Sequence, residues 1–269
     1  MRLIIDNDQY QLYARTDYAL SEITLLASAV AVGATTLTVI NPNGFSTNDF
    51  VLIEDIGNER AEIRQVTVSG AVFAVTALSY EHSSKTKVYR LQYDKVKFYE
   101  NDTALATVSL TPDYFTKYAS EVDTEKSYSV GYLNSQTNNE TPRGEVLNGW
   151  EYNLCSIGDC LQYESNGVEF GRLLDKVNIA SREIRAMFIS QDQEFTDLSA
   201  RDIARLREPT ALRALYYNFI ELIKNEKDVP TNKANLYLKL YDSKLKEVME
   251  TIDKQNTSVQ IWGQARVLR

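Results

Sequence analysis

The spacing of the apolar residues changes once along this chain, and this change constrains its fold more than any single motif. Up to about residue 150, apolar and polar residues alternate in short runs, as from Ala34 to Ile40, and such alternation is typical of β-strands with one buried face. Turn-forming residues separate the runs, for example at 41–44 and 69–70. Short strands between turns indicate a barrel or a sandwich. We therefore expect residues 1–150 to form a β-rich domain.

The alternation also gives finer expectations within this region. Its phase changes near Arg64 and Gln65, which predicts a β-bulge or a bend. In a later run, Leu105 is expected to point into the core. A division of the domain into two small β-modules, at about 20–93 and 94–150, stays open.

From about residue 156, apolar residues recur at steps of three and four, which is typical of amphipathic helices. Ser199 can cap a short helix, and Pro209 and Pro230 fit the first turns of two longer helices. Three amphipathic helices with short connections predict a compact bundle, so we assign residues 151–254 to a helical domain. The stripe expected on its first long helix consists of Phe170, Leu173, Val177, Ala180, Ile184 and Met187.

The last residues, 255–269, begin polar and end in a short alternating segment, so we expect an extended C-terminal arm. Its candidate partner-binding residues are Ile261, Trp262, Val267 and Leu268. An apolar segment around a tryptophan can add a strand to a neighbouring chain or fill an apolar pocket, and the alternative is that the arm folds back onto its own domain. The expected fold class is α+β, with an N-terminal β-barrel or sandwich region, a C-terminal α-helical bundle and this arm.

Residues suited to catalysis are scarce, since the chain holds 1 His and 2 Cys. His82 lies in a polar turn and is expected to be solvated. Cys155 and Cys160 are expected to be small apolar residues at the start of a helix rather than half of a metal site. No phosphate-binding loop, G-x-S-x-G elbow or H-E-x-x-H helix is found. We expect no catalytic, cofactor-binding or metal-binding residues, and a protein that is not an enzyme.

The formal charge of −8 argues against a protein that holds nucleic acid without sequence preference, because such binding needs a cationic face. Most of the acidic excess lies in residues 1–150, where it favours solubility. The run from Met1 to Asp6 lacks the pattern of a signal peptide. The longest apolar stretch, at about residues 23–32, is far shorter than the roughly 20 residues that span a bilayer. We expect a soluble protein that is made inside the cell.

Three segments resemble helices of the head-to-tail adaptor proteins of tailed bacteriophages, also called head-completion or connector proteins. These segments are Leu173–Phe188, with an Ala-Ser-x-Glu-Ile core, Pro209–Leu222 and Lys233–Tyr241. A fourth segment, Gly33–Arg90, is similar to small β-modules of phage structural proteins. The large β-rich region departs from the smallest adaptors, which are nearly all helical.

The resemblance implies a ring of identical subunits, commonly a dodecamer, docked beneath the portal protein. Genomic DNA would pass through the ring without specific binding, a stopper or tail protein would bind below, and the C-terminal arm would reach into the portal or a neighbouring subunit. The protein would be made in the cytoplasm of the bacterial host, would lie in the neck of the virion, and would need no cofactor and no membrane.

Two other functions compete with the adaptor. The first is a tail or baseplate protein whose β-domain binds carbohydrate or another virion protein. The second is an enzyme such as a glycan hydrolase, which needs only two carboxylates, although no spacing in this sequence singles out a pair.

Overall fold

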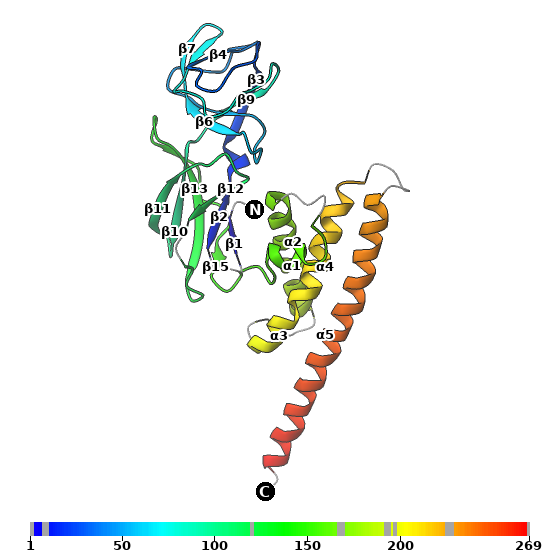
Figure 1. Cartoon of the computed structure of the whole chain (residues 1–269). Helices are drawn as coiled ribbons and strands as arrows, with labels where there is room; N and C mark the ends of the chain where they lie inside the picture. The colour runs from blue at the N-terminus through cyan, green and yellow to red at the C-terminus, as the bar shows by residue number, and fades with distance from the viewer. Residues whose placement is uncertain are drawn as a thin grey trace. The chain divides into compact units, whose positions relative to one another are not determined.

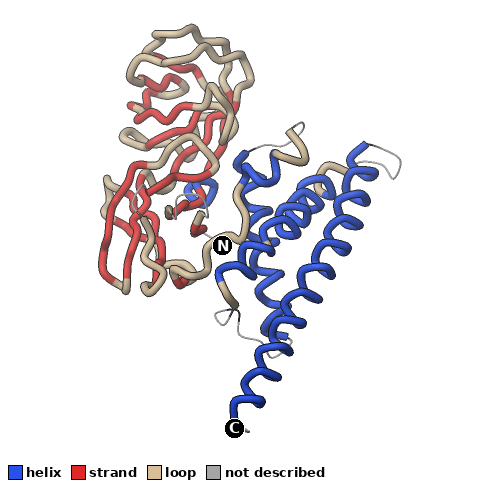
Figure 2. Tube along the Cα trace, turned by 60° about the horizontal axis from the view of Figure 1, so that its bottom comes forward, coloured by secondary structure: helices blue, strands red, loops and turns tan. Residues whose placement is uncertain are grey.

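The computed structural model describes residues 3–6, 11–118, 121–165, 170–190, 195, 198–223 and 229–267, with side chains described for most of these up to residue 252. The chain divides into two compact units, Met1–Tyr152 and Asn153–Arg269 (Figure 1). Within the described residues, the strands lie in the N-terminal unit and the α-helices in the C-terminal unit (Figure 2). The α+β class and the order of its parts are therefore as predicted.

The first strands of the N-terminal unit pair with strands from its second half. One antiparallel sheet has the order β1-β2-β12, and Arg15 on β2 pairs with Phe115 on β12. The other has the order β11-β10-β13-β14, with β15 also paired to β13. The strands are β1 (Leu3–Ile5), β2 (Leu12–Arg15), β10 (Lys95–Glu100), β11 (Thr103–Ser109), β12 (Phe115–Tyr118), β13 (Ser127–Asn134), β14 (Asn139–Glu140) and β15 (Leu147–Asn148). We call these two sheets the main β-module.

A second set of strands is inserted into the chain between β2 and β10. A 3-10 turn, η1 (Thr16–Ala19), precedes this set of strands. The first and last strands of the set are neighbours in one sheet, where Leu20 pairs with Leu91. Its two antiparallel sheets have the orders β3-β9-β5-β6 and β4-β8-β7. The strands are β3 (Leu20–Leu25), β4 (Thr36–Thr38), β5 (Phe50–Ile53), β6 (Glu62–Gln65), β7 (Thr67–Ser69), β8 (Val72–Ala74) and β9 (Lys87–Leu91). We call residues 20–91 the inserted β-module.

Of the two predicted forms, barrel or sandwich, the barrel is not found, because no sheet closes on itself in the part of the chain that the structure describes. Two apolar cores hold the sheets instead, and the first also includes Leu52 and Leu91 of the inserted β-module. The main core joins residues such as Ile5 on β1 and Phe98 on β10, and the core of the inserted β-module contains Val51 and Phe73. Burial of such side chains stabilises each module by roughly 1.5–3 kcal/mol per large residue before entropy is counted.

The phase change at Arg64 and Gln65 is a change of sheet rather than a bulge. The chain leaves β6 at Gln65 and starts β7 at Thr67, in the other sheet of the inserted β-module. Val66 lies buried between them and donates its backbone N–H to the carbonyl of Asp49. The predicted bend is therefore the point at which the chain passes from one sheet to the other. The change of sheet also changes which side chains face the core, as the phase change in the sequence indicates.

The prediction that Leu105 points inward is wrong, since its side chain is 36% exposed. The register between β10 and β11 shifts at Phe98, which faces Ala106, while Tyr99 faces Ala104. Leu105 is therefore the extra residue of a β-bulge on an edge strand, and a bulge changes the direction in which the side chain points.

The helices of the C-terminal unit begin where the sequence predicts. The Ser199 side chain accepts the backbone N–H of Asp202 and caps α3, and Ser156 and Asp159 form a capping box at α1. Pro209 lies in the first turn of α4, and Pro230 in that of α5. α4 packs against both α2 and α5. The helices are α1 (Ile157–Leu161), α2 (Phe170–Ser190), α3 (Ala200–Arg205), α4 (Arg207–Ile220) and α5 (Val229–Val267).

The expected extended arm is not found in the described residues, because α5 continues as one helix to Val267 (Figure 1). The polar run Lys254–Ser258 contains neither proline nor glycine, so nothing there ends the helix, and Gly263 alone costs a helix only about 1 kcal/mol. Among the described residues, none of the helices has the length and apolar character needed to cross a membrane.

Candidate functional site

A partly buried ion pair joins two helices of the bundle. Arg213 on α4 donates from Nε to Oε2 of Glu183 on α2 at 2.9 Å, and from Nη2 to Oε1 at 2.6 Å. Tyr217 donates its hydroxyl to the same carboxylate at 2.7 Å. The guanidinium also lies 4.9 Å from the ring centre of Tyr241 on α5, a distance at which a cation and an aromatic ring attract. One arginine therefore links α2, α4 and α5.

The pKa values of this pair keep both groups charged. Burial raises the pKa of Glu183, but the hydrogen bonds from Arg213 and Tyr217 and the charge of Arg213 outweigh it, so the pKa lies below its usual value. Burial lowers the pKa of Arg213, whereas its contacts with Glu183 raise it above its usual value. Because both charges are mutually satisfied, the pair fixes the relative position of the helices.

A groove of about 440 Å³ lies between residues of α1, α3, α4 and α5. Four of its charged residues pair with one another, Arg207 with Asp159 at 2.6 Å and Lys244 with Glu247 at 3.3 Å. Tyr163 donates to Glu208 at 3.0 Å, and burial together with that carboxylate raises the pKa of Tyr163 to about 12. The charged lining residues of the groove are balanced, with three of each sign: Asp159, Glu208 and Glu247 against Arg205, Arg207 and Lys244. Its apolar residues are Ala204, Ala211 and Val248.

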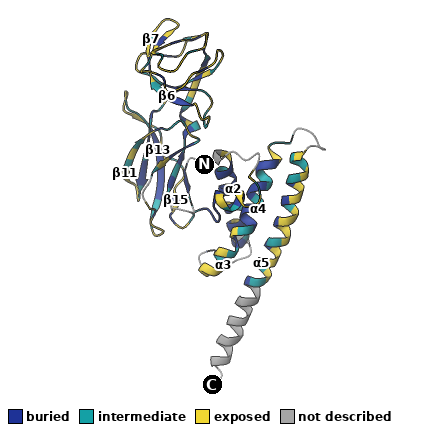
Figure 3. Cartoon of the chain, viewed as in Figure 1, coloured by how far each residue is buried: buried dark blue, intermediate teal, exposed yellow. Residues whose placement is uncertain are grey.

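The outer face of α5 carries an apolar stripe. Leu236 is 52% exposed and Leu240 is 39% exposed, and they lie one helical turn apart. Val229, also exposed, precedes Leu236 by seven residues and shares its face. Tyr237 and Tyr241, each one residue further along the helix, are buried, and the described part of α5 has both exposed and buried positions (Figure 3). We call Val229, Leu236 and Leu240 the outer stripe, and it is available for contact with another chain.

The predicted partner-binding residues lie at the end of α5. Ile261, Trp262 and Val267 are on the helix, in a part where side chains are not described, and Leu268 lies outside the described residues. The structure therefore places three of them on one continuous helix, and their role as partner-binding residues stays a prediction.

The two cysteines are buried at the start of α1, as the sequence predicts. The Cys160 thiol contacts the carbonyl of Ala211 at 3.8 Å. Burial, followed by the neighbouring Cys160 thiol, raises the pKa of Cys155 well above its ordinary value. A protonated thiol is a weak nucleophile and metal ligand. Among the described residues, no group of three or more His, Cys, Asp or Glu side chains could hold a metal ion.

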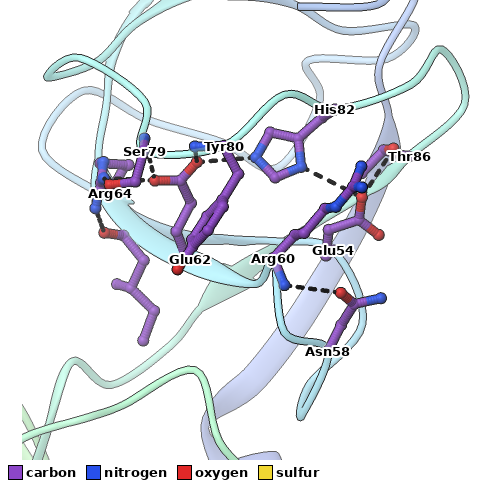
Figure 4. A network of polar contacts seen from close by, with 10 residues as sticks. Glu54, Asn58, Arg60, Glu62, Arg64, Ser79, Tyr80, His82 and Thr86 are labelled. Carbon is purple, nitrogen blue, oxygen red and sulfur yellow. Dashed lines mark hydrogen bonds and ion pairs between the residues drawn. The ribbon is translucent and has the colours of Figure 1, made fainter. Parts of the chain in front are cut away.

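The prediction for His82 is wrong, since this residue is 2% exposed. Its ring lies between two carboxylates, with Nε2 at 2.8 Å from Oε1 of Glu62 and Nδ1 at 3.2 Å from Oε1 of Glu54 (Figure 4). A backbone bridge to Val30 holds the segment against the rest of the inserted β-module. The polar neighbours of His82 in the sequence suggest solvent, but the sheet brings buried carboxylates to it.

Sequence reasoning missed this network because its members are far apart in the chain. The pairing of β5 with β6 places Ile53 opposite Glu62, and only this register brings Glu54 near the same ring. Burial raises the pKa of Glu62, but the hydrogen bond from His82 and the other donors around the carboxylate lower it below its usual value. Both ring nitrogens of His82 face carboxylates, which leaves no nitrogen directed at a nucleophile.

Comparisons with known proteins give little further information. No family model and no curated protein matches the chain. A solved structure that resembles part of it is the gp54 tailspike of Acinetobacter baumannii bacteriophage AP22, which is in complex with an A. baumannii capsular saccharide. The two are 20% identical, with a TM-score of 0.23, over 26% of this chain and 14% of the tailspike chain. This likeness is too distant to carry an argument about function.

Proposed function

We propose that this chain is a structural virion protein, the subunit of a head-to-tail adaptor ring of a tailed bacteriophage. One observation supports this proposal above the others: the three segments that resemble adaptor helices lie on α2, α4 and α5. These three helices are also the ones that Arg213 and Glu183 join. The resemblance therefore falls on one connected bundle rather than on scattered segments.

In this proposal the protein works by assembly and not by catalysis. The outer stripe and the end of α5 supply contacts with neighbouring copies and with the portal protein. A closed ring repeats each weak contact at every subunit, so contacts of modest strength add up to a stable assembly. A stopper or tail protein would bind the other side of the ring, and the genomic DNA would pass through it at the head–tail junction.

The experiment mixes the purified chain with portal particles of the same phage and images them by electron microscopy. The proposal predicts rings of this chain on the portal. The double variant L236S/L240S should fold but form few rings, because it removes the apolar residues of the outer stripe. K239A/K246A, which changes two exposed residues beside the stripe on the same helix, is the matched control and should assemble normally.

A second variant tests the end of α5. A chain that stops at Lys254 should fold and fail to join the portal. Normal assembly of this shortened chain would exclude the end of α5 from the contact. If the full chain ignores the portal and instead labels the distal end of the tail, the alternative of a tail or baseplate protein replaces the adaptor.

A further inference from the structure

The inserted β-module contains a histidine that two carboxylates contact from opposite sides. Glu54 faces Nδ1 and Glu62 faces Nε2, and the side chain of His82 is fully buried. An ionised carboxylate only accepts hydrogen bonds, and an imidazole donates from both nitrogens only when it carries two protons. In the neutral ring, the lone pair of one nitrogen would face a carboxylate oxygen. Both groups are hydrogen-bond acceptors, so their contact at a buried position, without a hydrogen between them, would destabilise the fold.

The charges around the ring balance in only one protonation state. Arg64 on β6 forms an ion pair with Glu62, and no further charged side chain contacts the ring in the described contacts. With a doubly protonated ring, two cations match the two carboxylates. Loss of one proton leaves one negative charge in excess at a buried position. The exposed pair Arg60–Glu81 lies at the border of the network, with an N–O distance of 3.4 Å.

The backbone at the network is held in a conformation that L-amino acids rarely adopt. Glu54 has a φ of 78° and Lys85 has a φ of 67°, both in the left-handed region. Such residues persist only where the surrounding contacts fix them. At Glu54 these contacts include the ring of His82, the hydroxyl of Thr86, which donates to Oε1 at 3.4 Å, and the carbonyl of Lys87, which accepts the backbone N–H of Glu54 at 3.0 Å.

The same network anchors the segment 79–86. The Glu62 carboxylate accepts the backbone N–H of Ser79 at 2.9 Å and that of Tyr80 at 3.4 Å (Figure 4). If these two bonds were lost, residues 82–86 would still be held by the backbone bridge between Val30 and His82 and by the backbone bonds of Leu26 with Lys85 and Thr86, whereas Ser79 and Tyr80 would lose the bonds from their amides to Glu62. Tyr80, whose side chain is exposed, would then no longer be presented in a fixed position.

We propose that Glu54, His82 and Glu62 form a protonation-dependent latch in the inserted β-module. The latch is closed when the His82 ring carries two protons. It opens as the pH rises and the ring loses one of them, which frees the amides of Ser79 and Tyr80 while the backbone bonds of Glu54 and of residues 82–86 remain. This proposal does not depend on the adaptor function.

Nuclear magnetic resonance of the full chain tests the latch directly, because His82 is the only histidine and its ring signals need no assignment. The ¹⁵N shifts of the ring report its protonation between about pH 5 and pH 8, where an ordinary histidine titrates. Hydrogen exchange of the backbone amides of Ser79 and Tyr80 reports the anchoring of the segment. We expect exchange of these amides, corrected for its intrinsic pH dependence, to rise about tenfold or more as the ring loses its proton.

Variants separate the latch from a general effect of pH. In E54Q one carboxylate charge is removed, so the ring should lose its proton, and the two amides their protection, at a lower pH than in the unmodified chain. E81Q, which changes an exposed neighbour that does not contact the ring, should leave both transitions where they are. Two results would overturn the proposal. In the first, the ring is singly protonated while the amides are protected, and Glu54 holds the second proton. In the second, the amides are equally protected in both protonation states of the ring. The measurement on the unmodified chain decides this even where a variant fails to fold.

Discussion

Arg213 and Glu183 form two parallel hydrogen bonds across the interface of α4 and α2, of 2.9 and 2.6 Å. The guanidinium also contacts the ring of Tyr241 on α5. Because the guanidinium of Arg213, on α4, contacts side chains of both α2 and α5, the relative positions of the three helices depend on this one polar side chain as well as on the apolar core. This dependence can be tested without changing any core residue.

Replacement of Arg213 by Met should therefore destabilise the helical unit. The carboxylate of Glu183 would lose its partner, and removal of one member of a buried pair costs about 3–5 kcal/mol. Since the Glu183 side chain is 31% exposed, water offsets part of this loss, and we expect about 2 kcal/mol. Denaturation by urea measures the change. Arg60→Met, which breaks an exposed pair, should change the stability by less than about 0.5 kcal/mol.

The same pair predicts how the helical unit responds to acid. Burial raises the pKa of Glu183, but its hydrogen bonds and the charge of Arg213 bring it below the usual 4.5. A carboxyl group with a lowered pKa stabilises the folded state fully above its unfolded value and loses this contribution as the pH falls through the folded value. Glu183→Gln should thus be less stable than the unmodified chain at pH 7, and the difference should shrink below about pH 4.5. A constant difference over this range, in thermal unfolding at several pH values, would contradict the assignment.

Because of the bulge on β11, we expect the apolar residue Leu105 to tolerate substitution by a charged residue. Leu105→Lys should change the stability of the N-terminal unit by less than about 0.5 kcal/mol, because the side chain is exposed. It should also reduce aggregation, since a charge on an edge strand opposes pairing with other chains. Val96→Ala, on the neighbouring strand and fully buried, should cost about 1–2 kcal/mol. Urea denaturation and light scattering measure the two effects, and a large loss from Leu105→Lys would show that the residue points inward.

The cysteines should be protected from modification in the folded protein. Burial, followed by the neighbouring Cys160 thiol, raises the pKa of Cys155 well above its ordinary value, and the thiolate is the reactive form. We expect a thiol reagent such as a dithiobis-nitrobenzoate to react slowly with both cysteines at pH 7 and rapidly once the helical unit is unfolded in urea. Rapid reaction in the folded state would contradict the described packing.

Local signals in the sequence predict much of this fold. Ser199, Pro209 and Pro230 mark helix starts through the chemistry of their own side chains, and those helices begin within a residue or two of the expected positions. Alternation likewise predicts most strands. What fails is information that arises only from strand pairing: the bulged register between the consecutive strands β10 and β11, which exposes Leu105, and the pairing of β2 with the distant strand β12.

The candidate sites show the same limit. His82 lies among polar residues in the sequence, and its burial depends on Glu54 and Glu62, which only the β5–β6 register brings to it. The extended arm was predicted from a polar run, but a polar run without proline or glycine also continues a helix, as α5 shows. The scarcity of His and Cys is read from the composition itself, and composition gives no position for the surfaces that contact other chains.

A reconstruction of the phage neck by electron cryomicroscopy tests the adaptor proposal most directly. The account predicts a ring of copies of this chain next to the portal, with α2, α4 and α5 forming the body of each subunit. Density for the chain only at the distal end of the tail, or no copy of it in the neck, would contradict the proposal.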